Sequence, residues 1–181
     1  MEMIDVYNEN NEFLGYSKTR DEVHEENLFH RHVSAWIMNY EGKILLQQRA
    51  FTKKKNPGKW AKTGGHVDAG ESCNDALKRE IKEEIGLNIS DIEEINVFKS
   101  ENPNYFSYNY IVFTNLNEED FILQKEEVNS VKYYDIEELE SYKKDNNKDF
   151  TFCKWNVDDF YNQMNILKEY RNKIKELGQK K

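Results

Sequence analysis

Three glutamates crowd into the nine-residue stretch REIKEEIGL, which spans residues 79–87. Glu80, Glu83 and Glu84 are spaced i, i+3 and i+4, so in a helix their side chains are neighbours. Like charges at i,i+4 destabilise a helix by roughly 0.2–0.5 kcal/mol per pair. A hard divalent cation among the carboxylates offsets this repulsion, and oxygen ligands suit Mg²⁺ or Mn²⁺. The spacing therefore predicts a metal site.

The apolar periodicity of residues 72–85 predicts a helix that turns two of these acids inward. With Leu77 at zero on a wheel of about 100° per residue, Glu84 falls at about −20° and Glu80 at about −60°. Glu83 lies further round, at about −120°. The solvent-facing side carries Asp75, Lys78 and Lys82. Burying a carboxylate is costly unless it is paired or binds a cation, so metal ligation explains these acids better than a solvated charged face.

Signals at both ends of this segment support the helix. Ser72 and Asp75 have the spacing of a capping-box-like start, and Gly86 stands where a helix favours a left-handed C-terminal residue. A glycine pair, Gly64 and Gly65, comes shortly before the helix. Without side chains, these glycines allow backbone carbonyls to approach a metal or a phosphate closely.

Residues 65–87, GHVDAGESCNDALKREIKEEIGL, resemble the Nudix box at every specified position. The box is glycine, five residues, glutamate, seven residues, then Arg-Glu-aliphatic-any-Glu-Glu-any-Gly-aliphatic. A motif of this length is far more specific than a short glycine fingerprint. The matching positions are Gly65, Glu71, Arg79, Glu80, Ile81, Glu83, Glu84, Gly86 and Leu87.

This resemblance implies an α/β fold, the Nudix-type α/β/α sandwich with a mixed sheet, and hydrolysis of a nucleoside diphosphate linked to another group. It implies Mg²⁺ or Mn²⁺ as the cofactor, held by Glu80, Glu83 and Glu84, with the carbonyl of Gly64 as a further candidate ligand. By the same resemblance Glu83 or Glu84 is the general base, Arg79 orients a glutamate, and Glu71 supports the junction between loop and helix. Such chemistry needs charge neutralisation and an activated water, which bound divalent ions supply.

Many Nudix enzymes recruit one more glutamate from a loop that precedes a strand. Glu126 and Glu127 occupy such a place, directly before the strand expected at residues 128–134. A solvated acidic pair is the competing interpretation. Of the two, Glu127 is the preferred catalytic candidate.

Residues 30–60, HRHVSAWIMNYEGKILLQQRAFTKKKNPGKW, are also similar to isopentenyl diphosphate isomerase, which shares the Nudix fold. That resemblance implies that Arg49 and Lys53 hold the substrate diphosphate, the arginine as a bidentate fork and the lysine as a point charge. His30 and His66 match positions that bind the isomerase's own metal.

Two departures argue against isomerase activity. Gly64 stands where the isomerase needs a cysteine, and NYFSYNYIVF supplies no acid after Glu101. The four histidines do not show the spacing of two zinc ligands on one helix, so a zinc site is not predicted. His32 is expected to be structural, and His66, beside the box, to contact substrate.

Other segments predict the elements around the box. A hairpin is expected from residues 3–7 and 13–17, with strands at 32–38, 43–48, 92–99, 106–114 and 128–134. A short helix is expected from Ile136, and an amphipathic helix near the C-terminus. The aromatic segment 150–155 either belongs to the core, which is favoured, or walls the pocket. The same two roles, core or pocket wall, are open for Tyr105, Phe106 and Tyr108.

The 181 residues predict one domain, divided into an N-terminal hairpin (1–29), a core (30–145) and a C-terminal helical segment (146–181). A net charge of −8 argues against nucleic-acid or membrane-surface binding. Two distant cysteines predict neither a disulfide framework nor a cysteine metal site. No apolar run of membrane length or signal peptide is visible, so we expect a cytoplasmic protein that acts on a small-molecule diphosphate. A homodimer is compatible with this fold.

Three functions compete. A Mg²⁺-dependent pyrophosphohydrolase leads, because the box is intact. A nucleotide-sensing module would keep the fold without turnover, but it would be expected to lose some of these acids. An isomerase-like enzyme is the remote alternative.

Overall fold

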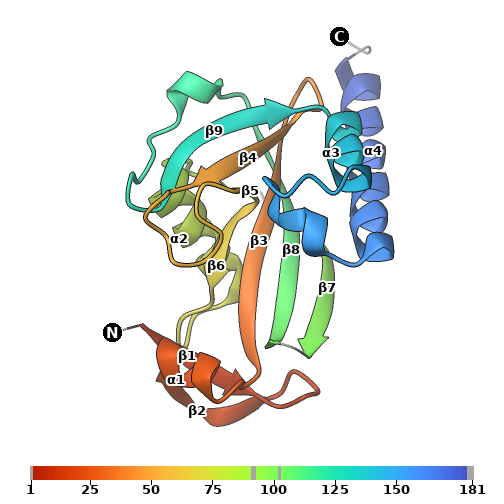
Figure 1. The fold of residues 1–181 in the computed structure, drawn as a ribbon. Helices are drawn as coiled ribbons and strands as arrows, with labels where there is room; N and C mark the ends of the chain where they lie inside the picture. Colours follow the sequence, from red (N-terminus) through yellow and green to blue (C-terminus); the bar gives the residue numbers. More distant parts are fainter. Residues whose placement is uncertain (1, 91–92, 102, 179–181) are drawn as a thin grey trace.

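A mixed sheet of seven strands organises the molecule, and a two-stranded hairpin lies at one end (Figure 1). The structure, a computed structural model, describes residues 2–90, 93–101 and 103–178. The described strands are β1 Met3–Tyr7, β2 Phe13–Thr19, β3 His30–Asn39, β4 Ile44–Arg49, β5 Trp60–Ala61, β6 Thr63–His66, β7 Glu93–Glu101, β8 Asn104–Thr114 and β9 Val128–Tyr134. The described helices are α1 Arg20–Glu25, α2 Cys73–Ile85, α3 Ile136–Lys144 and α4 Val157–Gly178, with short 3-10 turns η1 Glu118–Asp120 and η2 Thr151–Lys154.

The sheet splits between its two central strands. The sheet order is β5-β4-β3-β8-β7, with β3 and β8 parallel over ten residue pairs. In contrast, β3 and β4 pair only where Ile37 faces Leu45 and Met38 faces Ile44. Beyond that point β4 pairs with β5, whereas β3 pairs with β6, and β9 pairs with β4 from Ile44 to Arg49. The two halves therefore diverge, and they leave room between them for a site.

Alternation along β3 sends successive side chains to opposite faces of the sheet. Val33, Ala35 and Ile37 pack in the cluster that contains Leu77 and Ile81 of α2. Trp36 and Met38 belong to a second cluster with side chains of α3 and α4, including Leu139, Phe160, Met164 and Leu167. Figure 1 shows α2 on one side of the strands and the α3–α4 pair on the other, an α/β/α arrangement as expected.

The predicted strands, the helix at residues 72–85 and the two C-terminal helices are confirmed, with small changes in their bounds. Residue 92, the expected start of one strand, lies outside the described residues. The short elements α1, β5, β6 and η2 were not predicted. With two to six residues each, they are too short to show a clear hydrophobic period.

The ends of α2 form as the sequence indicates. The Ser72 side chain accepts a hydrogen bond of 3.1 Å from the backbone N–H of Asp75. Gly86 adopts a left-handed conformation with φ of 72°, where a side chain would be strained. These two caps set the register that turns one face of α2 toward the sheet.

The N-terminal hairpin brings α1 against the main sheet. The Thr19 side chain caps α1, and bridges link Ile4 to Asp68 and Tyr7 to Phe29. This docking carries His24 of α1 toward the start of β3. Among the described helices, none has the length and apolar character needed to cross a membrane.

Candidate functional site

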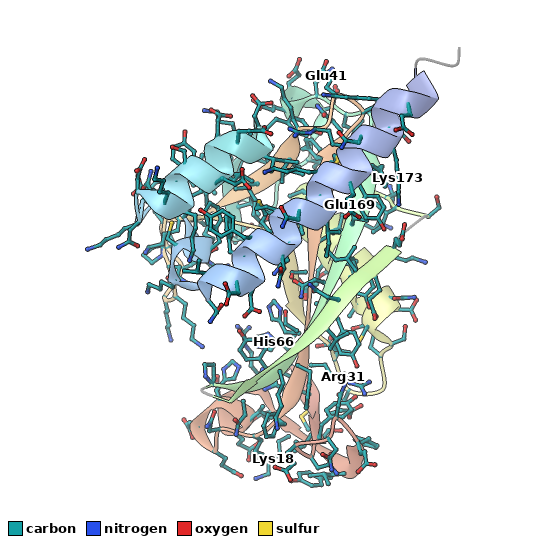
Figure 2. The ribbon with its side chains drawn as sticks, turned by 90° about the vertical axis from the view of Figure 1, so that its right-hand side faces the viewer. Lys18, Arg31, Glu41, His66, Glu169 and Lys173 are labelled. Carbon is teal, nitrogen blue, oxygen red and sulfur yellow. The ribbon has the colours of Figure 1, made fainter. Side chains whose placement is uncertain are left out.

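A cavity of about 1000 Å³ opens where the two halves of the sheet diverge. Its lining comes from α1, β3, the β4–β5 loop, β6, α2, β8 and η2. It brings together the acids Glu80, Glu83 and Glu84 of the box, basic residues of the loop and four histidines. Figure 2 shows His66, one of the lining residues, between the N-terminal hairpin and the helices α3 and α4. All of the predicted site residues except Glu71 therefore line one cavity, and Glu71 accepts a hydrogen bond from the lining residue Arg79.

Glu84 is a buried carboxylate on the cavity wall, with 6% of its surface exposed. Gln47 Nε2 donates a hydrogen bond of 2.8 Å to Glu84 Oε2, and Thr63 Oγ1 donates one of 3.2 Å to Gln47 Oε1. Within the described part of the chain, no lysine or arginine forms an ion pair with Glu84. Burial raises the pKa of this carboxyl to about 7. The hydrogen bond that holds the Glu84 carboxyl thus comes from the neutral amide of Gln47.

Glu80 lies one turn before Glu84, and its side chain is 16% exposed. Its carboxylate fills the space into which a Cβ atom on Gly65 would project. Arg79 Nη1 donates to Glu80 Oε1 at 2.8 Å. Burial still raises the pKa of Glu80, although the nearby Arg79 lowers it in part. A side chain at residue 65 would therefore displace the Glu80 carboxylate from its present position.

Arg79 ties α2 to the loop before it. Its Nε and Nη2 donate to the two carboxylate oxygens of Glu71, at 3.1 and 2.9 Å, and Nη2 also donates to the His66 carbonyl at 3.1 Å. Glu83 is the most exposed of the three acids, with a side chain 56% exposed and 3.5 Å from Arg79 Nη1. The structure confirms the predicted directions: Glu80 and Glu84 point inward, and Glu83 is the more exposed acid.

The basic loop faces these acids. Arg49 and Lys53 both line the cavity, and so does Glu127. Lys53 Nζ and Glu127 form an ion pair at 2.5 Å, whereas Arg49 Nε donates to the Lys55 carbonyl at 3.1 Å. Glu126 is exposed and does not line the cavity. Of the two loop glutamates, Glu127 is the one within reach of the site.

Three histidines, from α1, β3 and β6, converge in the part of the cavity near the N-terminal hairpin. The ligand atoms of His24, His30 and His66 all lie within 4.8 Å of one another, and His24 Nε2 is 3.1 Å from His66 Nε2. His32 stacks edge-on against His66, with ring centroids 5.6 Å apart. Burial lowers the pKa of each, to about 4 for His24 and about 3 for His32, so the rings are neutral near pH 7.

The histidine spacing predicted no zinc site, whereas the isomerase resemblance matched His30 and His66 to metal-binding positions, and the structure brings these two residues together with His24. The three residues come from α1, β3 and β6, so no helix-type spacing could reveal them. Neutral imidazoles suit Zn²⁺ and similar ions, so the cluster could hold such a metal. Among the described residues, the three histidines are the group whose ligand atoms all lie within 4.8 Å of one another. The three carboxylates of α2 lie further apart than that.

The aromatic segment serves both of the roles considered for it. Phe150 and Phe152 are buried in the cluster beneath α4, whereas Trp155 lines the cavity. Lys143 of α3 anchors the segment, since its Nζ donates to the carbonyls of Phe152, Cys153 and Trp155 at 3.2, 3.0 and 2.6 Å. The same division holds on β8, where Phe106 is buried and Tyr105 lines the cavity.

Lys62 is one of the lining residues that the sequence analysis did not predict. Lys62, between β5 and β6, is half-buried, and its Nζ lies 5.0 Å from the ring centroid of Trp36 and 4.7 Å from that of Trp155. Burial lowers the pKa of its amine to about 7. Alternation was the available signal, because in an extended segment Lys62 shares a face with Gly64 and His66.

The donors on α2 fit a hard divalent cation. Glu84 is buried and has no ionic partner among the described residues, Glu80 is turned toward Gly65, and both acids line the cavity. Such oxygens suit Mg²⁺ and Mn²⁺, which prefer carboxylate and carbonyl ligands. Glu83 and the Gly64 carbonyl are the remaining candidates for ligands, and Gly64 also lines the cavity.

Comparison with protein families gives a match to the NUDIX domain over residues 28–155. The chain is 37% identical to Nudix hydrolase 3 of Arabidopsis thaliana over 156 residues, which are 78% of this chain and 20% of that protein. It is 31% identical to an uncharacterised Nudix hydrolase of Clostridium acetobutylicum over 165 residues, covering 84% of this chain and 79% of the relative. The chain thus spans only a fifth of the plant relative.

Two further similarities concern the isomerase branch and the fold. An isopentenyl-diphosphate Delta-isomerase of Serratia proteamaculans is 37% identical over 97 residues, 53% of this chain and 52% of that enzyme. A crystal structure of a protein from Deinococcus radiodurans superposes with a TM-score of 0.65 at 22% identity, covering 77% of this chain and 87% of the other. At that identity the superposition bears on the fold alone.

Proposed function

This chain belongs to the Nudix hydrolase family, and from that premise we propose that it cleaves the phosphoanhydride bond of a small organic diphosphate with a bound divalent cation. One observation carries the proposal. Glu84 is a buried carboxylate that forms no ion pair with a described lysine or arginine, on the wall of a cavity whose facing loop is basic. A buried, unpaired carboxylate is costly unless a cation joins it.

We propose Glu80, Glu83 and Glu84, with the Gly64 carbonyl, as the groups that hold Mg²⁺ or Mn²⁺. When bound, the cation supplies positive charge that neutralises the bridging phosphates and acidifies the attacking water. Arg79 keeps Glu80 aimed into the cavity through its hydrogen bond, and Glu71 in turn holds Arg79. Both therefore act by positioning.

Arg49 and Lys53 are proposed to bind the substrate phosphates. Lys53 is already paired with Glu127, so it must exchange that carboxylate for a phosphate oxygen when substrate enters. The exchange releases Glu127, which can then accept a proton or join the cation. Glu83 and Glu84 remain the candidates for the base that accepts the proton of the water.

A panel of diphosphates tests the proposal. Purified protein is incubated with Mg²⁺ and nucleotide sugars, dinucleotides or nucleoside diphosphates, and mononucleotide and phosphate release are followed by chromatography. Release should depend on metal and should be lost in Glu84→Gln. A wild-type protein that releases nothing from any member, with metal present, would contradict the hydrolase assignment.

An isomerase is the second candidate, favoured by the histidine cluster and by the similarity to the Serratia enzyme. Against it, Gly64 stands in the place of the required cysteine, and neither Cys73 nor Cys153 lines the cavity. Incubation with isopentenyl diphosphate and either Mg²⁺ or Zn²⁺ decides between them. Appearance of the allylic isomer in proton NMR would favour the isomerase.

A further inference from the structure

Lys62 has a place in the cavity that the proposed reaction does not use. Its ammonium lies beside the rings of Trp36 and Trp155, at 5.0 and 4.7 Å from their centroids, and the two rings contact each other edge-on with centroids 6.0 Å apart. It also donates a hydrogen bond to Asn109 Oδ1. Trp36 and Asn109 are fully buried, so the amine is held against a rigid wall.

None of these partners carries a negative charge. Among the described residues no carboxylate forms an ion pair with Lys62, whereas Lys53, on the same cavity, pairs with Glu127 at 2.5 Å. Contact with aromatic faces offsets only part of the cost of removing an ammonium from water. The amine is therefore left with unsatisfied capacity for an anion, and it faces the cavity.

A purely structural role explains this arrangement less well. Ser34 Oγ already donates to Asn109 Oδ1 at 3.1 Å, so the amide oxygen would keep a donor without the lysine. Trp36 likewise has its own partner, since its Nε1 donates to Gln163 Oε1 at 2.7 Å. An apolar side chain at residue 62 could pack against the same residues, and it would avoid the cost of burying a charge.

The place of Lys62 relative to the box sets a length scale. Gly65, which abuts the Glu80 carboxylate, lies three residues further along an extended segment, so about 10 Å of backbone separates it from Lys62. Alternation puts the two residues on opposite faces of this segment, and both line the cavity. The cavity thus has a cation-binding end with Glu80 and Arg49 and a second cationic point one strand segment away. A substrate with its diphosphate at the first end would reach the second with the group it carries.

We propose that Lys62, beside Trp36 and Trp155, binds a second anionic group, a phosphate or a carboxylate, on the part of the substrate beyond the hydrolysed diphosphate. This inference rests on the proposed function, because it takes the substrate to be an organic diphosphate. It narrows the substrate class to diphosphates whose attached group is itself acidic.

Two matched pairs of diphosphates test the proposal. Coenzyme A differs from dephospho-coenzyme A by one ribose phosphate, and UDP-glucuronic acid differs from UDP-glucose by one carboxylate. Binding is measured by calorimetry without metal, so that no turnover is needed. Wild-type protein should bind the more acidic member of at least one pair at least tenfold more tightly, and the pair that responds identifies the phosphate or the carboxylate.

Lys62→Met should bring that ratio close to one, and Lys62→Arg, which keeps the charge, should retain most of it. The matched control is Lys54→Met, an exposed lysine of the basic loop outside the cavity, which should keep the wild-type ratio. Circular dichroism melting checks that each variant is folded. If Lys62→Met does not fold, the comparison uses Lys62→Arg and the wild-type ratio.

A wild-type ratio near one in both pairs, or a ratio that persists in folded Lys62→Met, would overturn the proposal. Metal-dependent hydrolysis is recorded separately for each compound. Absence of turnover with the binding ratio intact would overturn the hydrolase assignment alone, whereas turnover without the ratio would overturn the role of Lys62 alone.

Discussion

The carboxylate of Glu80 occupies the volume beside Gly65 in which a Cβ atom would stand. The contact is with the end of a flexible side chain, so the acid can move aside at modest cost. The neighbouring Gly64 differs, because a Cβ there would meet the backbone carbonyl of Val33. Two adjacent glycines are thus needed for separate reasons, one for the direction of an acid and one for strand packing.

Gly65→Ala should therefore weaken metal binding more than folding. Wild-type protein should gain stability from millimolar Mg²⁺ or Mn²⁺, by about 2.7 kcal/mol at a metal concentration one hundred times the Kd. In Gly65→Ala that gain should fall by more than half, while the metal-free protein loses only about 1 kcal/mol. Thermal melts with Mg²⁺ and with chelator measure both quantities.

Gly64→Ala is the contrasting variant, and it should destabilise the metal-free protein strongly. Equal metal-induced shifts in wild type and Gly65→Ala would show that Glu80 is not a ligand. The absence of any shift in wild type would count against a formed site on α2.

Glu84→Gln should separate stability from activity. Without metal, the change removes a buried charge and its repulsion from Glu80, so stability should stay level or rise by a few tenths of a kcal/mol. With Mg²⁺, kcat should fall on the order of a hundredfold or more, because a ligand or base is lost. Chemical denaturation in chelator and steady-state kinetics give the two readouts.

Lys82→Gln, on the exposed face of the same helix, is the control and should change neither quantity. If Glu84→Gln instead kept full turnover and lowered stability, Glu84 would be a structural acid.

The pH dependence adds a check, since a carboxyl with a pKa raised to about 7 contributes stability at low pH that is lost as pH rises through 7. Metal-free Glu84→Gln should lack that loss.

Arg49→Ala and Lys53→Ala should impair substrate use without unfolding the protein. Each removes a cation proposed to hold a phosphate, and each should raise KM or lower kcat/KM by roughly tenfold. Lys53→Ala also frees Glu127 from its ion pair, so its effect on kcat can differ from that of Arg49→Ala. Kinetics unchanged in the double variant would mean that the loop is merely a solvated basic surface.

The histidine cluster should make the metal-free protein sensitive to acid. Burial lowers the pKa of His30 and His66 below 6.5, so the unfolded chain binds protons that the folded chain excludes. Their contribution to stability is present above pH 6.5 and is lost as pH falls, by roughly 1 kcal/mol for each buried histidine between pH 7 and 5. Denaturation midpoints across this range measure the loss.

His66→Gln should flatten that acid dependence, since it removes one titrating ring of the cluster. A stability curve that stays level from pH 7 to 5 in wild type would contradict the buried, neutral state of these rings.

The sequence predicted the carboxylate face of the site because that face is local. Glu80 and Glu84 lie on one helix with a clear period, so their inward direction follows from about 100° per residue. Arg49 and Lys53 were found through a resemblance over a continuous stretch. Both kinds of signal are carried by neighbours in sequence.

The histidine wall and Lys62 depend on contacts between distant elements. His24 reaches His66 only because the hairpin docks α1 on the sheet, a step that no local pattern encodes. Lys62 meets Trp155 across more than ninety residues of chain. A lysine in a lysine-rich stretch looks solvated until the fold shows what surrounds it.

Lys143 holds the aromatic wall of the cavity by carbonyl oxygens, atoms that every amino acid has. The side chains of Thr151, Lys154 and Trp155, which face the cavity, take no part in that anchoring. Mutations there can therefore change what the wall recognises while the wall keeps its place. Evolution can in this way retune substrate choice on one side of the cavity, independently of the carboxylates on α2.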